Sequence, residues 1–410
     1  MTAPLAGIKV LEVASWLAAP NCAALMSDMG AEVIKVEPPG GDTYRRMYDA
    51  LLGPNSVHPS YQLDNRGKRG ICINLEDPAG PELVRKLAVD ADVFITNLTR
   101  PRLEKYGLTD ADIHAIYPQA IYAVLSGYGT DGPDSERQAF DQTAFWARTG
   151  AMSMFGDRDG IPLLSRGGYG DRMTSLNLLT SILAALRIRE QTGEGQYVEV
   201  TLQRTGLWAM ASDTVQALYD RVTADKTSQA EPPNPIWNYY RTKDDRWFAL
   251  VMPMPLLYWP KFCDMLGRDD WKQDERYHTV LGLMEHGKAL VPELIELFVS
   301  QDLEHWREKL DAAGLIWEPV ALTTEVIEDP ALRERDAFSM VVHERAGAME
   351  ILSAPFHIRD AEVSVKGPAP DAGQHTREVL TEQGLSDDEL QSLIERGVVS
   401  QFAGDDEAQA

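Results

Sequence analysis

An aspartate set among glycines is the residue of this chain best suited to covalent chemistry. Asp171 ends the segment Gly167-Gly168-Tyr169-Gly170-Asp171 and stands directly ahead of a long apolar helical stretch at 176–188. Glycines beside a carboxylate leave room for a substrate carbonyl, and nearby backbone N–H groups can receive a developing negative charge. Asp171 is therefore the candidate nucleophile. The alternative for an aspartate at this place is a helix N-cap, and the glycines then form only a flexible loop.

Basic side chains recur through the first third of the chain, although the 410-residue protein has a formal net charge of −24. Taken one at a time, they are ordinary surface charges. Together, near the ends of expected strands, they indicate a local site for an anionic ligand, whereas the overall charge disfavours nucleic acid and anionic membranes as partners. These residues are Arg45, Arg46, Arg66, Lys68, Arg69, Arg100, Arg102 and Lys105.

The spacing of apolar residues predicts the elements that must position these side chains. The expected strands are 8–13, 32–37, 71–75, 93–97 and 120–126, and the expected helices between them are 20–29, 81–89 and 110–117. Strands and helices that alternate in this way predict an α/β fold with a parallel sheet and right-handed crossovers. Ligands of such sheets bind beyond the carboxyl ends of the strands, here at 14–19, 38–41, 97–100 and 126–133.

The second half of the chain has a different pattern. An apolar helix at 201–211 is followed by a polar stretch at 223–235, which is typical of a linker. Beyond it we expect a hairpin at 237–242 and 247–252, then helices at 256–266, 286–300 and 303–313, a strand at 355–366, helices at 376–383 and 387–396, and a disordered tail at 403–410.

Several common sites are absent from the sequence. The turn after the first strand, 13–20, has no G-x-G-x-x-G, which disfavours nicotinamide and flavin enzymes, and there is no phosphate loop, G-x-S-x-G elbow or H-E-x-x-H pair. The three cysteines are widely spaced, so we expect free thiols and no metal. No apolar run approaches the roughly 20 residues of a membrane span, and the first residues do not resemble a signal peptide, so we expect a cytoplasmic protein.

Six segments, in this order and spacing, carry a resemblance to a known family. They are 4–12, 30–38, 65–70, 125–133, 192–196 and 373–376. The chain resembles the family III CoA-transferases, the group of the carnitine and bile-acid CoA-transferases, formyl-CoA transferase and the α-methylacyl-CoA racemases, from Pro4 to about Val399. The resemblance implies a large Rossmann-like parallel-sheet domain, a smaller α+β domain and an interlocked homodimer. It places the large CoA-binding domain at 1–222, the small domain at 234–325, and a C-terminal part that returns to the large domain at 337–402, with a second linker near 323–336.

The resemblance also implies roles for individual residues. Asp171 matches the catalytic carboxylate of the family. The implied CoA contacts are Trp16, Leu17, Ala18, Lys68, Arg69, Ile73, Asn97, Lys105 and Arg137, and the implied substrate pocket is formed by Phe140, Gly168, Tyr169 and Gly170. Coenzyme A and its acyl thioester are then substrates, with no tightly bound cofactor and no metal. The second substrate is a small carboxylic acid.

The implied reaction moves CoA from an acyl-CoA to a free acid through an aspartyl anhydride and an aspartyl-CoA thioester. Leu17 replaces a glutamine of formyl-CoA transferase and Pro38 replaces an arginine, while the glycine run of that enzyme is missing between Pro232 and Met254. Formate or oxalate is therefore a less expected substrate. Within the family, the segments 13–20, 127–133, 140–144 and 147–150 most resemble those of enzymes that act on branched or aromatic 2-hydroxy acids. Two alternatives stay open: a 2-methylacyl-CoA racemase, which Phe140 disfavours because it replaces a histidine base, and a non-catalytic CoA-binding subunit of a hetero-oligomer.

Overall fold

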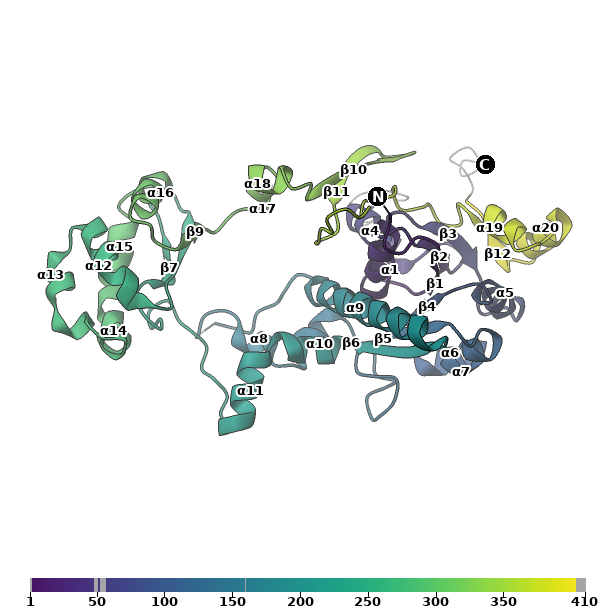
Figure 1. Cartoon of the computed structure of the whole chain (residues 1–410), viewed down its shortest axis with the longest axis horizontal. Coiled ribbons are helices and arrows are strands. Elements are labelled where there is room, and N and C mark those ends of the chain that lie inside the picture. Colours follow the sequence, from purple (N-terminus) through teal and green to yellow (C-terminus); the bar gives the residue numbers. More distant parts are fainter. Residues whose placement is uncertain (1, 48–50, 52–56, 159, 403–410) are drawn as a thin grey trace. The chain divides into compact units, whose positions relative to one another are not determined.

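The computed structural model describes residues 2–47, 51, 57–158 and 160–402, so the expected disordered tail lies outside the described residues. The chain divides into two compact units (Figure 1). Unit 1 comprises Met1–Met152, Leu164–Tyr219 and Ala331–Ala410, and unit 2 comprises Ser153–Leu163 and Asp220–Pro330. The C-terminal segment therefore packs with the N-terminal half of the chain.

A seven-stranded sheet forms the centre of unit 1. Its order is β12 (Val399–Ser400), β3 (Arg69–Ile73), β2 (Glu32–Glu37), β1 (Lys9–Val13), β4 (Val93–Thr96), β5 (Ile121–Ser126) and β6 (Gln196–Thr201). Strands β1 to β6 pair in parallel, and only β12 runs antiparallel, on β3. The predicted parallel α/β fold is confirmed, while β6 and β12 were not expected.

Helices cover both faces of this sheet because its strands are apolar on both sides. In β1, Val10 faces one core, while Leu11 and Val13 face the other, as the alternation of a strand requires. The first core is closed by α1 (Ala18–Asp28) and α9 (Tyr169–Thr192). The second is closed by α5 (Ala79–Ala88), α6 (Arg100–Tyr106), α7 (Asp110–Ile116), α19 (Thr376–Glu382) and α20 (Asp387–Glu395) (Figure 1).

Short helices connect the strands of unit 1 or follow β6. They are α2 (Thr43–Arg46), α4 (Pro59–Asn65), the π-helix η1 (Asp141–Ala147), α8 (Ala151–Met154), α10 (Leu202–Ala209) and α11 (Ala211–Asp220). Helix α10 packs so closely on η1 that a Cβ at Gly206 would lie 2.6 Å from the carbonyl oxygen of Phe145. π-helices are rare and often occur at functional sites, which draws attention to η1.

Two expectations for unit 1 are wrong. The segment 355–366 forms no strand, apart from an isolated bridge between Ala361 and Thr2, and the C-terminal hairpin lies earlier, at β10 (Phe338–His343) and β11 (Gly347–Leu352). The long helix before the sixth strand begins at Tyr169 and not at 176, because glycine and polar residues in its first turns hide the apolar period.

Unit 2 is a small α+β structure. Its antiparallel sheet has the order β7 (Trp237–Arg241), β8 (Trp247–Val251), β9 (Trp317–Pro319), and the first two strands form the predicted hairpin. One aromatic-rich core joins this sheet to α12 (Pro255–Leu266), α13 (Asp269–Gln273), α14 (Val280–His286), α15 (Val291–Phe298) and α16 (Leu303–Ala312). The segment expected to be a second linker carries the short helices α17 (Thr323–Val326) and α18 (Pro330–Arg333). Within the described residues of both units, no helix has the length and apolar character needed to cross a bilayer.

Candidate active site

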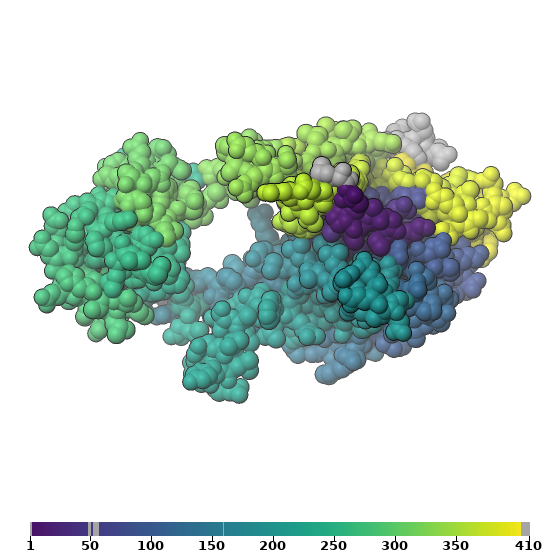
Figure 2. Space-filling view, in the orientation of Figure 1, coloured from purple at the N-terminus to yellow at the C-terminus, as the bar shows by residue number. Residues whose placement is uncertain are grey.

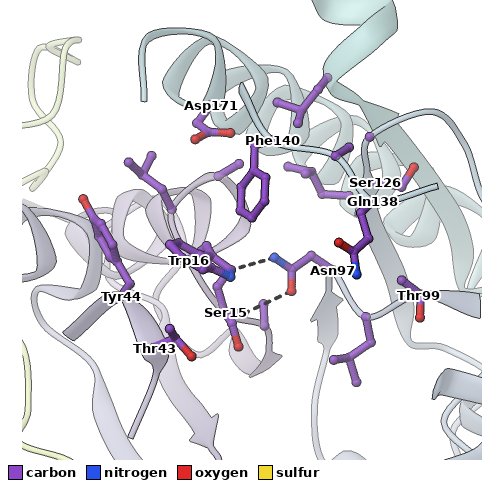
Figure 3. Close-up of a pocket in the computed structure, with 18 of the residues that line it drawn as sticks. Ser15, Trp16, Thr43, Tyr44, Asn97, Thr99, Ser126, Gln138, Phe140 and Asp171 are labelled. Carbon is purple, nitrogen blue, oxygen red and sulfur yellow. Dashed lines mark hydrogen bonds between the residues drawn. The ribbon is translucent and has the colours of Figure 1, made fainter. Parts of the chain in front are cut away.

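A cavity of about 1120 Å³ opens at the carboxyl ends of the parallel strands. Strand β1 has β2 on one side and β4 on the other, so the order of strands reverses there, and such reversals are the usual ligand sites of parallel sheets. The lining comes from the loops after β1, β2, β4 and β5 and from the start of α9 (Figure 3). The volume is at the upper end of ordinary ligand pockets, as a large ligand requires.

Asp171 lines this cavity from the first turn of α9. The N-cap position is Gly168, in the left-handed conformation at φ 93°, so the interpretation of Asp171 as the N-cap is wrong. The side chain is half-buried. Burial, together with the charges of Asp141 and Asp64 and against the opposing charge of Arg172, raises the pKa of its carboxyl to about 7. A poorly hydrated carboxylate at a cavity wall has the properties of a nucleophile.

Asp141 fixes the turn that carries Asp171. It is the buried first residue of η1, and its Oδ2 accepts a 2.9 Å hydrogen bond from the Gly168 N–H. Burial raises the pKa of Asp141, and the N–H groups at the start of α9 oppose that rise. A Cβ at Gly170 would lie 2.2 Å from Asp141 Oδ1 and 2.3 Å from Phe145 Cγ. Only glycine therefore allows this carboxylate so close to the helix start.

A third carboxylate lies beneath Arg172. Asp64 is fully buried at the end of α4, and its oxygens accept hydrogen bonds from Asn21 Nδ2 at 2.9 Å and from Arg172 Nη2 at 3.1 and 3.3 Å. Burial raises the pKa of Asp64 to about 6, and Arg172 lowers it in part. Three carboxyl groups thus surround the start of α9, with Arg172 among them.

Two aromatic rings face Asp171 across the cavity (Figure 3). Trp16 and Phe140 meet edge to face, with ring centroids 5.4 Å apart and an interplanar angle of 82°. Trp16 has φ 68°, a left-handed conformation that is costly for a bulky residue. Its backbone N–H donates hydrogen bonds to both carboxylate oxygens of Asp42, at 3.1 and 3.3 Å. These bonds hold Trp16 in that conformation.

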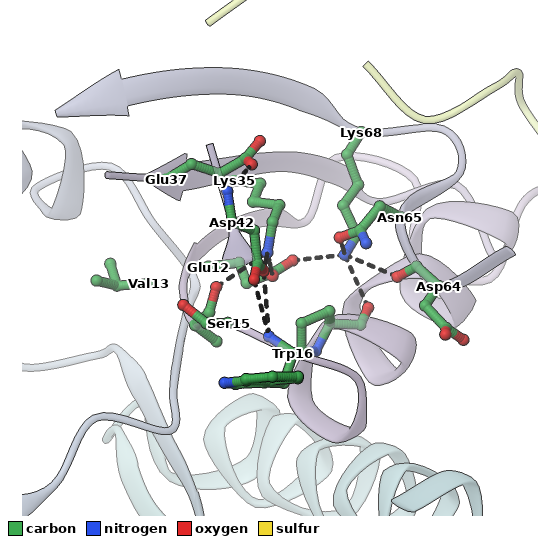
Figure 4. A network of polar contacts seen from close by, with 12 residues as sticks. Glu12, Val13, Ser15, Trp16, Lys35, Glu37, Asp42, Asp64, Asn65 and Lys68 are labelled. Atoms are coloured by element: carbon green, nitrogen blue, oxygen red, sulfur yellow. Dashed lines mark hydrogen bonds and ion pairs between the residues drawn. The ribbon is translucent and has the colours of Figure 1, made fainter. Parts of the chain in front are cut away.

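A buried ionic network lies next to the Trp16 loop (Figure 4). Lys35 Nζ lies 2.7 Å from Glu12 Oε1 and 3.3 Å from Asp42 Oδ2, and Lys68 Nζ lies 2.6 Å from Glu12 Oε2. All four side chains are fully buried. Lys68 also donates to the Pro20 and Asp64 carbonyls and to Asn65 Oδ1. Burial lowers the pKa of Lys68 to about 8. Its donors are occupied inside the protein, so it shapes the loop and does not reach the cavity.

The residues expected from the sequence divide into two groups. Trp16, Leu17, Ala18, Ile73, Asn97, Arg137, Phe140, Gly168 and Asp171 line the cavity, and Lys68, Arg69, Lys105, Tyr169 and Gly170 do not. Arg69 pairs with two glutamates of α19, and the exposed Lys105 pairs with Glu76. Tyr169 packs on Trp146. Within the lining, the Asn97 amide exchanges two hydrogen bonds with the backbone of Ser15, at 2.7 and 3.0 Å.

The basic residues that line the cavity are all arginines: Arg100, Arg102, Arg137, Arg166 and Arg172. The cavity thus offers several cationic side chains in a protein that has a strong net negative charge. Arginine binds phosphate and carboxylate groups through two parallel hydrogen bonds, which suits an anionic ligand.

Residues 5–376 match the model of the CoA-transferase family III. The chain belongs to that family. It is 32% identical over 397 residues to (R)-2-hydroxy-4-methylpentanoate CoA-transferase of Clostridioides difficile, covering 96% of this chain and 99% of that protein. It is 28% identical over 391 residues to cinnamoyl-CoA:phenyllactate CoA-transferase of Clostridium sporogenes, covering 94% of this chain and 95% of the relative. The chain is therefore a CoA-transferase, an enzyme whose substrates are CoA thioesters.

Solved structures agree with the fold. A CAIB/BAIF family protein from Brucella suis superposes with a TM-score of 0.83 at 28% identity, over 93% of this chain and all of that one. Rv3272 from Mycobacterium tuberculosis gives a TM-score of 0.80 at 26% identity, over 92% of this chain and 99% of that one. The family resemblance and the fold class predicted from the sequence are confirmed.

Proposed function

We propose that this CoA-transferase works through covalent intermediates on Asp171. The observation that carries the proposal is the position of this carboxyl, which lies half-buried in the wall of the main cavity with its pKa raised to about 7. The ionised form is poorly hydrated and hence reactive toward a thioester. The absence of a side chain at Gly168 lets Arg172 and Leu17 pack closely against the start of α9.

The reaction proceeds in two matching halves. The Asp171 carboxylate attacks the donor thioester, and the C–S bond breaks to release CoA thiolate and leave a mixed anhydride. The thiolate attacks the aspartyl carbonyl, and the anhydride C–O bond breaks to give aspartyl-CoA and the free donor acid. The acceptor carboxylate then attacks aspartyl-CoA, and the C–S bond breaks to give a second mixed anhydride and CoA thiolate. The thiolate attacks the acceptor carbonyl, and the anhydride C–O bond breaks to free the Asp171 carboxylate. Asp171 and the new acyl-CoA are the products.

The cavity lining supports binding of acyl-CoA. We assign its apolar and amide contacts to Trp16, Leu17, Ala18, Ile73 and Asn97, which all line the cavity. The phosphates of CoA are matched by the arginines of the rim, among them Arg137. No tightly bound cofactor takes part in this reaction. We also keep the interlocked homodimer as part of the proposal, on the strength of the family resemblance.

We propose that the acceptor is a branched or aromatic carboxylic acid. A 2-hydroxy acid of this kind would match the relatives named for 2-hydroxy-4-methylpentanoate and phenyllactate. The edge-to-face pair of Trp16 and Phe140 supports this choice, since it gives the cavity an aromatic wall near Asp171. Phe140 carries no titratable group, so a racemase reaction that needs a base at that position is disfavoured. The presence of Asp171 disfavours a non-catalytic subunit.

Trapping of the covalent intermediate tests the proposal. The protein is incubated with cinnamoyl-CoA, treated with hydroxylamine, digested and mapped by mass spectrometry. We expect a hydroxamate at Asp171, because hydroxylamine attacks the aspartyl thioester and releases CoA. Asp171→Ala should fold, bind acyl-CoA and remain unlabelled and inactive. Turnover by Asp171→Ala, or a label on another residue, would refute the assignment.

A further inference from the structure

We propose that Arg172 binds the carboxylate of the free acid as that acid enters or leaves the site, and that Asp64 positions Arg172 for this task. The inference rests on the proposed reaction at Asp171, because only a transferase that exchanges free acids needs such a group. It names a specificity-determining residue and the chemical group that this residue recognises.

The reaction creates a charge problem at the start of α9. Each half-reaction places the carboxylate of a free acid, either the donor acid or the acceptor acid, next to Asp171. The charges of Asp141 and Asp64 already act on Asp171 there. Carboxylates that approach one another repel unless a cation stands between them. Arg172 is the cation whose charge acts against the raised pKa of Asp171. Its guanidinium is therefore near enough to stabilise a second carboxylate at the same place.

The geometry leaves Arg172 both held and accessible. Its Nη2 is held at 3.1 and 3.3 Å by Asp64, which is itself fixed by Asn21, and the Asn21 oxygen accepts a 2.7 Å hydrogen bond from Ser175. The side chain is still 36% exposed and lines the cavity. Its Nε is buried and has no hydrogen-bond partner among the residues that the structure describes, and its Nη1 donates a 3.4 Å hydrogen bond to the Gly168 carbonyl.

Gly168 lets the guanidinium lie close to the start of α9. A Cβ on this residue would lie 2.8 Å from Arg172 Nη1 and 2.9 Å from Leu17 Cδ1. Any other residue would therefore push the arginine away from the helix start or displace the first loop. An arginine held in this way can offer its exposed donors to a carboxylate with little loss of side-chain entropy.

Two other arginines of the cavity, Arg100 and Arg137, are less suited to this role. Arg100 pairs with Glu104 at 2.8 Å, and Arg137 lies 3.6 Å from Asp134 and over the ring of Tyr128. These two belong to α6 and to the loop after β5, where the phosphates of CoA are expected. Arg172 directly follows the reacting residue on the same helix.

Steady-state kinetics distinguish binding of the acid by Arg172 from a purely structural role, in which the Arg172–Asp64 ion pair only joins α9 to α4. With cinnamoyl-CoA as donor and phenyllactate or (R)-2-hydroxy-4-methylpentanoate as acceptor, Arg172→Met should raise the KM of the acid at least about tenfold, as loss of a charge-assisted pair predicts. The KM of the acyl-CoA should change less than about threefold, since a thioester carries no carboxylate at the reacting carbon. The KM of the acid for Arg172→Lys should lie between the values for the wild-type protein and for Arg172→Met. Arg187→Met, at an exposed position of the same helix, is the matched control.

The outcomes separate the inference from the proposed function. Equal rises in both KM values, or an unchanged KM for the acid, overturn the role of Arg172 even when Asp171 is still labelled by hydroxylamine. A missing label on the wild-type protein defeats the nucleophile whatever Arg172 does. If Arg172→Met fails to fold, direct calorimetric binding of phenyllactate to Arg172→Lys decides: affinity equal to that of wild type overturns the inference.

Discussion

Replacement of Asp171, the proposed nucleophile, should make the protein more stable, and the gain should depend on pH. In the folded protein burial raises the pKa of Asp171 to about 7, whereas an unfolded chain has an aspartate pKa near 3.9. Between these values the folded state holds a proton that the unfolded state has lost. The stability of the wild-type protein therefore falls as the pH rises from about 4 to 7. In Asp171→Asn the side chain at position 171 is an uncharged amide that does not titrate, so the stability of this variant does not fall for this reason as the pH rises.

The size of the effect follows from the difference between the two pKa values. A difference of about 3 units corresponds to about 4 kcal/mol, and water at the half-buried carboxyl reduces it, so we expect about 2–4 kcal/mol above pH 8. At pH 4 the two proteins should differ little. The assay is the free energy of urea unfolding at both pH values, with Asp213→Asn, at an exposed position of α11, as the control for the substitution itself.

The same ionisation should control the rate. Only the carboxylate attacks the thioester, so the rate of the first half-reaction should fall as the pH drops below about 7. A stability difference between Asp171→Asn and wild type that is the same at pH 4 and pH 8, or a variant less stable than wild type at pH 8, would contradict the account of the buried carboxyl.

Three further predictions concern the surroundings of Asp171. Trp16→Gly should be more stable in urea than Trp16→Ala, by about 1 kcal/mol, because the left-handed conformation is costly for any residue except glycine; the reverse order would contradict this. Lys68→Met should lower the free energy of urea unfolding by about 3–5 kcal/mol, since it leaves Glu12 buried with one partner fewer; a loss below 1 kcal/mol would show that the network contributes little. In heavy water, mass spectrometry should detect no deuterium at the α-carbon of a 2-methylacyl-CoA, because Phe140 has no base to offer; incorporation would revive the racemase alternative.

Local patterns were enough to predict the sheet and the place of the site. The apolar runs that became β1 to β5 are short and bounded by turns, and their order implied a parallel sheet with ligands at the carboxyl ends. Strand β6 was missed because Gln196, Tyr197 and Glu199 interrupt its apolar pattern. The prediction of a strand at 355–366 is wrong because this segment pairs with no neighbouring strand among the described residues. Its one ladder contact there is the isolated bridge between Ala361 and Thr2. The domain boundaries and the cytoplasmic location stay predictions.

The site was predicted in part for a physical reason. Asp171 is flanked by glycines in the sequence, which is a local signal. The contributions of Asp141, Asp64 and Arg172 depend on burial and on contacts between distant segments, and no spacing of residue types reveals those. The family resemblance implied a CoA contact for Lys68, but its ammonium group is buried among oxygen acceptors. The sequence thus indicates which residues carry charge, and only the fold decides which of them face the cavity.

Transfer of oxygen to the enzyme is the most direct test of the central claim. In the proposed mechanism an oxygen of the acceptor carboxylate becomes the bridging oxygen of the anhydride, and attack by CoA thiolate on the acceptor carbonyl leaves that oxygen on Asp171. After turnover with cinnamoyl-CoA and phenyllactate labelled with ¹⁸O in its carboxylate, we predict ¹⁸O in the peptide that contains Asp171. Turnover without ¹⁸O in that peptide would contradict the account.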